Sequence, residues 1–279
     1  MSGASPLAAC EEVRMVCARN ALTAPLVEGT IANENLTLLW SELAASGPRF
    51  LRLLESMNWD VAELPLVTSL IARSRGFPVT LLPVAVQARF QHPYFVVDEA
   101  RGMRLESIRT VGVRSHTATT VVWIKSMLRE RGIDPGTIRW IAMDGGDVPG
   151  HSEPPALERM PPGDLRQMLS ERRLDAAVLP DIRGVCGVRG AFGDADACAR
   201  EWHARRGFAQ INHVLVANSA FAHERPSALT ALLDLVRRAK AQLDASQADV
   251  ADFFPVGWPA MEPCLALVEA EVRAEGLIA

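Results

Sequence analysis

The sequence of 279 residues predicts an α/β protein built from two lobes with a ligand cleft between them. Short apolar runs alternate with amphipathic segments through the first hundred residues and again through the middle hundred, which is typical of α/β lobes. The chain is also longer than a single hydrophobic core usually supports. After the second lobe it continues with one more predicted strand and two long helices. If these rejoin the first lobe, that lobe is discontinuous and the chain crosses between lobes twice.

The first lobe begins with apolar runs that are short enough for strands. We predict strands at 13–17, 36–40, 60–64, 79–86 and 94–97, and helices at 48–57 and 66–72. The run 79–86 is almost continuously apolar, as in strands that are buried on both faces. Helix 48–57 places its leucines and Phe50 on one face.

The stretch 110–146 predicts a strand–helix–strand unit. The apolar run 111–113 is a strand, the residues from Val121 to Arg131 form an amphipathic helix that Gly132 ends, and 138–143 is the next, parallel strand. Ser115 or Thr117 is the expected N-cap. The loop that enters this helix is the expected anion site, because helix amides converge there. It contains Ser115, His116, Thr117 and Thr119, although Ser and Thr at these positions can also serve only as caps.

The remaining elements complete a discontinuous arrangement. We predict helices at 165–172, 195–206, 226–243 and 259–275, strands at 174–180 and 211–217, and no regular structure at 182–194. Residues 1–100 and 208–279 then form lobe 1, and residues 101–207 form lobe 2. This is the organisation of a bilobal periplasmic-binding-protein-like (type II) fold, with the ligand in the central cleft.

Composition excludes several classes of function. The net charge of −4 indicates no polyanion-binding surface, so no nucleic-acid partner is expected. No run of about 18 apolar residues could cross a bilayer, and the first 15 residues lack the pattern of an export signal, which predicts a cytoplasmic location and no membrane partner. The five cysteines are odd in number and show no CxxC spacing, which argues against a disulfide frame or a zinc site.

Several collinear segments also resemble the 4,5-dihydroxyphthalate decarboxylase family. They are the run 111–146, VGVRSHTATTVVWIKSMLRERGIDPGTIRWIAMDGG, together with Asp60-Val-Ala-Glu63, Phe90-Gln-His92, Pro149-Gly150, Met168-Leu169 with Leu174-Asp-Ala-Ala177, Ile211-Asn-His213-Val and Gly257-Trp-Pro259. The resemblance implies the bilobal fold and a cytoplasmic carboxy-lyase, a decarboxylase of a hydroxylated aromatic (catechol-type) or similar small carboxylic acid.

This chain departs from the family pattern at four positions. His116 stands where a tyrosine is expected, and Gln91, His151 and Asp181 stand where the family tends to have arginines. Arginine is the side chain best suited to grip a carboxylate, so these losses indicate a substrate less anionic than a phthalate. Arg89 or Arg114 could replace one of the missing arginines.

Decarboxylation requires a proton donor and polar groups around the substrate. The predicted catalytic residues are His116, His92, His213 and Glu63. The predicted substrate-binding residues are Arg89, Arg114, Ser115, Thr117, Thr119, Asp144, Gly145, His151 and Asp181. No cofactor is predicted, although three histidines and one carboxylate could also surround a divalent metal. His213 could equally be a core residue with an ordinary hydrogen bond, and Glu63 an ordinary acid at the end of a strand.

Two other functions fit the same fold. One is a non-catalytic solute-binding protein, and the other is a dehydratase-type lyase. The expected partner is in each case a small molecule, here a carboxylate, and a homo-oligomer is left open.

Overall fold

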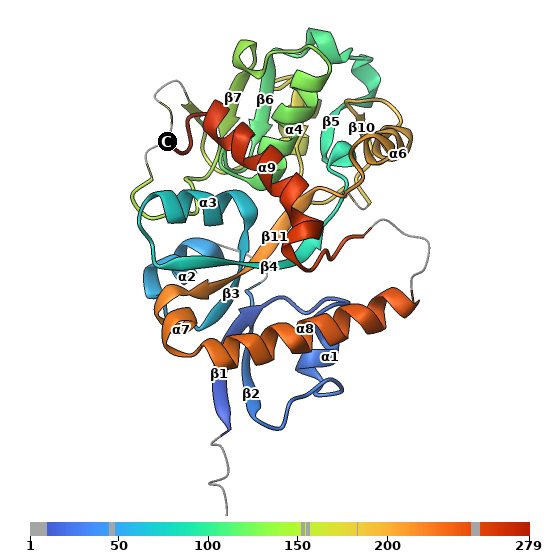
Figure 1. Ribbon diagram of the computed structural model, residues 1–279. Helices are drawn as coiled ribbons and strands as arrows, with labels where there is room; N and C mark the ends of the chain where they lie inside the picture. Colours follow the sequence, from blue (N-terminus) through green and yellow to red (C-terminus); the bar gives the residue numbers. More distant parts are fainter. Residues whose placement is uncertain (1–9, 45–47, 152–153, 155–156, 183, 247–251) are drawn as a thin grey trace, which may run out of the picture.

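Two β-sheets flanked by helices form two lobes that follow each other along the long axis of the molecule (Figure 1). The computed structural model describes residues 10–44, 48–151, 154, 157–182, 184–246 and 252–279. Residues 1–9, on which the prediction of no export signal partly rests, lie outside this range. The predicted bilobal α/β architecture is confirmed.

The first sheet has five strands. Their order is β2 (Leu36–Glu42), β1 (Glu11–Cys17), β3 (Val61–Pro65), β11 (Ile211–Asn218) and β4 (Val79–Ala88). β1 is parallel to both of its neighbours, and β11 is antiparallel to β3 and β4. The helices of this part of the chain are α1 (Ala24–Val27), α2 (Arg49–Ser56), α3 (Leu66–Ser74), α7 (Ser219–Glu224) and α8 (Pro226–Ser246).

β4 is buried on both faces, as its apolar sequence predicts. Leu81 and Ala85 belong to a core cluster shared with α2 and α3, whereas Leu82, Val84 and Val86 belong to a second cluster shared with α8. Because successive side chains of a strand point to opposite faces, a run of apolar residues supplies both clusters at once.

The second sheet has six strands. Their order is β10 (Val188–Gly190), β5 (Phe95–Asp98), β9 (Ala176–Val178), β6 (Thr110–Val113), β7 (Arg139–Ala142) and β8 (Glu158–Arg159). Its helices are α4 (Thr119–Glu130), α5 (Leu165–Ser170) and α6 (Ala195–Arg206). β6, α4 and β7 form the predicted strand–helix–strand unit, and β6 and β7 are parallel. β10 falls within 182–194, where no regular structure was expected.

Gly112 in β6 is required by packing. A Cβ atom at this position would lie 2.4 Å from Leu174 Cδ1 and 2.7 Å from Leu165 Cδ2. We therefore expect Gly112→Ala to destabilise the fold by about 1–3 kcal/mol through overpacking, measured by urea denaturation. Gly145→Ala is the control, because its Cβ would meet nothing closer than 3.5 Å. Equal stability of both variants would contradict this role of Gly112.

The chain crosses between the sheets through two segments that lie side by side. One joins β4 to β5, and the other joins α6 to β11. The Arg89 amide donates to the Gln210 carbonyl oxygen at 2.9 Å, and the Gln91 amide donates to Gln210 Oε1 at 3.0 Å. The first crossing thus lies before β5. The sequence-based division at residue 100 assigns β5 to lobe 1, whereas β5 pairs in the second sheet.

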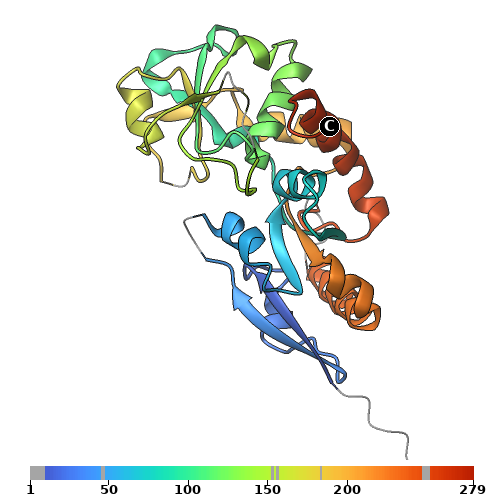
Figure 2. The same ribbon diagram turned by 90° about the vertical axis from the view of Figure 1, so that its left-hand side faces the viewer.

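The C-terminal helix α9 (Trp258–Ala274) bridges the two sheets. It contacts α3 and β4 of the first lobe and α4 of the second (Figures 1 and 2). Two cations of α4 form ion pairs with acids of the C-terminal segment: Lys125 with Glu275, and Arg129 with both Glu271 and Glu275. The sequence-based prediction assigned this segment to lobe 1, and its helix contacts both lobes.

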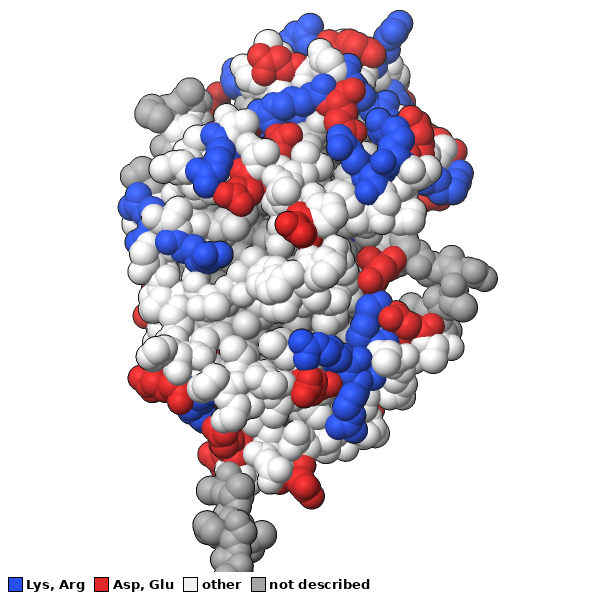
Figure 3. Space-filling view, in the orientation of Figure 1, with Lys and Arg blue, Asp and Glu red and all other residues white. Residues whose placement is uncertain are grey.

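On the face shown in Figure 3, basic and acidic side chains are interspersed, and few charged groups lie across its middle. A mixed surface of this kind offers no continuous basic patch to a polyanion.

Candidate functional site

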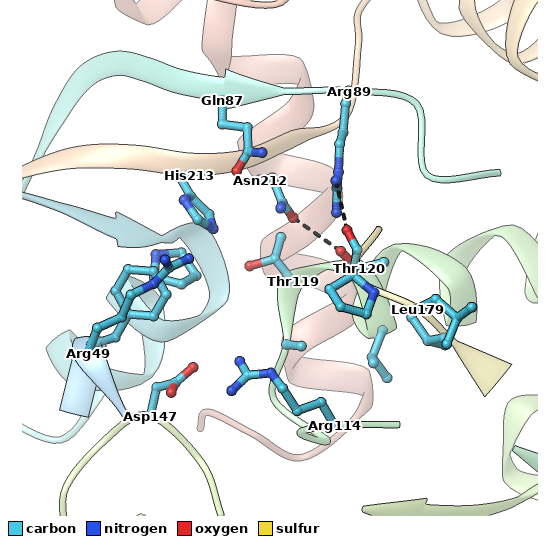
Figure 4. Close-up of a pocket in the computed structure, with 16 residues that line it drawn as sticks. Arg49, Gln87, Arg89, Arg114, Thr119, Thr120, Asp147, Leu179, Asn212 and His213 are labelled. Carbon is cyan, nitrogen blue, oxygen red and sulfur yellow. Dashed lines mark hydrogen bonds between the residues drawn. The ribbon is translucent and has the colours of Figure 1, made fainter. Parts of the chain in front are cut away.

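A cavity of about 440 Å³ is lined by residues of both lobes (Figure 4). The polar and charged side chains around it are Arg49, Gln87, Arg89, Arg114, Thr119, Thr120, Asp147, Asn212 and His213. Phe50, Pro65, Val178, Leu179 and Pro180 supply apolar walls. A concave site with apolar walls and a few converging polar groups is typical of small-molecule binding.

The N-terminus of α4 faces this cavity without a capping side chain. The N-cap residue is Ala118, not Ser115 or Thr117 as predicted. The hydroxyl groups of Ser115 and Thr117 lie 3.1 Å apart and are buried beside the helix start. The amides of Thr119 and Thr120 have no acceptor among the described residues. These amides and the helix dipole therefore favour an anion in the cavity.

Three arginines from separate elements surround the same cavity. Arg49 belongs to α2, Arg89 follows β4 and Arg114 follows β6. The Arg89 guanidinium lies 3.7 Å from the centre of the Tyr94 ring and donates one hydrogen bond, of 3.3 Å, to the Pro180 carbonyl oxygen. Burial lowers its pKa, while nearby groups such as Asp181 partly oppose this. Arg114 forms an ion pair of 3.2 Å with Asp144. The cavity is consequently electropositive.

Glu63 and His213 form a buried pair at the wall of the cavity. His213 Nδ1 lies 2.5 Å from Glu63 Oε1, and Glu63 also accepts from the Ala18 amide at 2.8 Å and the Cys17 thiol at 3.2 Å. Burial alone would raise the pKa of the Glu63 carboxyl, but His213 and these donors hold it below its usual value. The imidazole is thus oriented through Nδ1, which leaves Nε2 available to a ligand. Both residues were predicted, and the structure brings them together.

His116 does not lie in this cavity. It is only 6% exposed, and it lines a separate pocket of about 610 Å³ with Lys125, Trp140 and Glu275. Its Nε2 lies 3.5 Å from Lys125 Nζ. Burial, assisted by Lys125, lowers the pKa of His116 to about 4.

His92 lies in another pocket, with Arg131 and Arg205. Burial and these two cations lower its pKa to about 4. Three pockets therefore separate His92, His116 and His213, so they cannot share one metal ion. Among the described residues, no three His, Cys, Asp or Glu side chains gather as metal ligands would.

The other predicted residues divide between the cavity and its surroundings. Arg89, Arg114 and Thr119 line the cavity itself, and Asp144 and Gly145 line a neighbouring space of about 550 Å³ that Arg114 shares. His151 and Asp181 line neither space.

Sequence reasoning missed Arg49, Gln87, Thr120, Asp147 and Asn212. Asn212 precedes His213 in β11, and strand alternation would have placed the two side chains on opposite faces; the strand register is irregular at this point. Arg49 carries no local signal of its role.

Several solved structures with a similar fold are described as binding proteins. No protein-family model and no curated protein matches the sequence. The periplasmic aliphatic sulphonate binding protein of Escherichia coli has 15% identity and a TM-score of 0.56, covering 94% of this chain and 79% of its own. A zinc-bound ligand-binding component of an ABC-type import system from Staphylococcus aureus has 10% identity and a TM-score of 0.58, covering 96% and 93%. A putative periplasmic sulfonate-binding protein of an ABC transporter from Methylobacillus flagellatus has 12% identity and a TM-score of 0.56, covering 98% and 89%.

At these identities the likeness defines the fold, which is that of the bilobal periplasmic binding proteins. Two predictions are corrected by these neighbours. The prediction of a carboxy-lyase is wrong, because the neighbours are described as binding components, and the narrower resemblance to a decarboxylase family receives no support. The predicted cytoplasmic location is wrong on the same ground, since two of the three are described as periplasmic. Within the described part of the chain, no helix is long and apolar enough to cross a membrane.

Proposed function

We propose that this protein binds a small acidic solute, a sulfonate or a carboxylate, in the cavity between its lobes, without transforming it. The observation that carries the proposal is that the uncapped N-terminus of α4 and three arginines converge on one cavity. Helix amides offer neutral donors to an anion, and guanidinium groups add charge and paired hydrogen bonds. Both kinds of donor suit the planar carboxylate and the tetrahedral sulfonate.

Two further observations support binding of an anion. The only carboxylate among the lining residues is Asp147, so the lining arginines outnumber the acids. Arg89 forms no ion pair with any acid among the described residues, which leaves its charge for a ligand. Two of the structural neighbours are described as sulfonate-binding, which agrees with this class of ligand.

Calorimetric and thermal-denaturation titrations with small acids test the proposal. The panel pairs each acid with its neutral amide: ethanesulfonate with ethanesulfonamide, propionate with propionamide, and benzoate with benzamide. We expect at least one acid to stabilise the protein by about 2.7 kcal/mol at 100 times its Kd, and its amide to have little effect. Equal stabilisation by acid and amide, or by neither, would contradict an anion site.

A further inference from the structure

Asp147 is a buried acid without a partner in the part of the chain that the structure describes. Three acidic residues of the described chain are less than a tenth exposed: Asp60, Glu63 and Asp147. Asp60 is paired with Arg14 at 2.8 Å, and Glu63 is paired with His213 at 2.5 Å. Asp147 is 7% exposed, yet its carboxylate forms no hydrogen bond or ion pair with any described residue. Partial removal from water without a bonding partner costs stability, so the fold itself gains nothing from this carboxylate. Its oxygens are not among the fully enclosed side-chain atoms that lack a partner, so they reach the space of the cavity.

The neighbouring charges do not remove this cost. Burial raises the pKa of Asp147, and Arg114 and Arg49 oppose the increase without cancelling it. Arg114 is already paired with Asp144 at 3.2 Å, so Asp147 is not needed as its counterion. Asp144 and His213 are the other titratable groups that act on Asp147. A polar group that is left unpaired beside a cavity is better explained by a ligand than by folding.

The position of Asp147 shows which part of a ligand it would meet. It lies between Arg49 and Arg114, across the cavity from Gln87 and Arg89 (Figure 4). It also lines the adjoining space of about 550 Å³, together with Arg114. A ligand whose acidic group is held at the N-terminus of α4 and Arg89 would therefore present its other end to Asp147.

We propose that the ligand is an acid that also carries a hydrogen-bond donor, an amino or hydroxyl group, and that Asp147 accepts from this donor. This inference rests on the proposed function, because it assumes that the acidic group of the ligand is held at the N-terminus of α4 and Arg89. An ammonium group would donate a hydrogen bond to the Asp147 carboxylate and also form an ion pair with it. A hydroxyl group would donate a hydrogen bond without the ion pair, which is weaker. The site then selects bifunctional acids over simple ones.

A matched series of ligands tests the inference. The series is ethanesulfonate, 2-hydroxyethanesulfonate and 2-aminoethanesulfonate, with their three-carbon counterparts and the corresponding carboxylates, each titrated calorimetrically. We expect the wild type to bind an amino or hydroxyl acid at least about tenfold more tightly than the unsubstituted acid. Asp147→Asn keeps the shape and an acceptor oxygen but removes the charge. This variant should lose any preference for the amino-substituted acid over the unsubstituted acid. It should keep a preference for the hydroxy-substituted acid, so the result shows which of the two donors Asp147 binds.

Two controls complete the design. Asp234→Asn changes an exposed acid of α8 and should leave every affinity unchanged. Asp147→Asn without ligand should melt at or above the temperature of the wild type, because it removes an unpaired buried charge.

Equal binding of all three members of each series would overturn the inference and leave the proposed function intact. An amino preference that survives in Asp147→Asn would also overturn it. Failure of every acid to bind would contradict the proposed function and this inference together.

Discussion

Replacing Arg89 by alanine is expected to lower the affinity for the acidic ligand by about 100-fold, or roughly 2.7 kcal/mol. Arg89 lines the cavity and has five N–H donors, of which only the bond to Pro180 is used within the described structure. Its guanidinium is held in place over the Tyr94 ring, so little side-chain entropy is lost when an anion binds. Removing it would delete a positioned and partly desolvated charge from the site.

Isothermal titration with the best acid of the panel measures this effect. Arg89→Lys should lose less affinity than Arg89→Ala, because it keeps the charge but not the planar fork of donors. Arg166→Ala serves as the matched control, since Arg166 is an exposed arginine whose partner is Asp164. If Arg89→Ala binds as tightly as the control, Arg89 does not contact the ligand.

Lowering the pH from 7 to 4 is expected to destabilise the protein strongly, chiefly through His92 and His116. Burial and neighbouring cations lower the pKa of each to about 4, from an ordinary value of 6.5. Between these values the unfolded chain binds protons that the folded chain does not, so stability falls as the pH falls. Each histidine should contribute a loss of about 3 kcal/mol that is complete near pH 4. Above pH 7 neither residue affects the pH dependence.

Urea denaturation at pH 7, 6, 5 and 4 measures this loss. His92→Phe keeps an aromatic ring in contact with Phe192 and removes the titrating group. The substitution breaks no hydrogen bond of Nδ1, because this buried atom has no partner among the described residues. The variant should therefore retain roughly half of the dependence on pH. His223→Phe is the control, because His223 is exposed. If His92→Phe and the wild type lose the same free energy, His92 is not held neutral in the folded state.

Local patterns were sufficient to predict most elements of the fold. The apolar run of β4 and the segment from β6 through α4 to β7 were recognised because their periodicity extends over several residues. β10 was missed, since a strand of three residues has no usable period and is defined by pairing with β5. The cap of α4 was misplaced because Ser and Thr are preferred cap residues and Ala is a poor one, yet the backbone places Ala118 at the N-cap.

The candidate site was predicted in part. The loop entering α4 was predicted to be an anion site from its place after β6, and Thr119, Arg89, Arg114 and His213 line the cavity. His116 was expected there and is buried against Lys125 instead. A histidine in a polar segment carries no sequence signal of its burial, since that depends on how α4 packs against the sheet and on the C-terminal segment that brings Glu275 to Lys125.

By itself, the sequence determined the two α/β lobes and the helix start that faces the cavity. These features follow from hydrophobic periodicity, which is a property of neighbouring residues. Only the tertiary structure decided that Arg49 of α2, Arg114 after β6 and the unpaired Asp147 surround one cavity. Their convergence depends on the pairing of strands and the packing of lobes that are distant in the chain, and no local pattern of side chains encodes it.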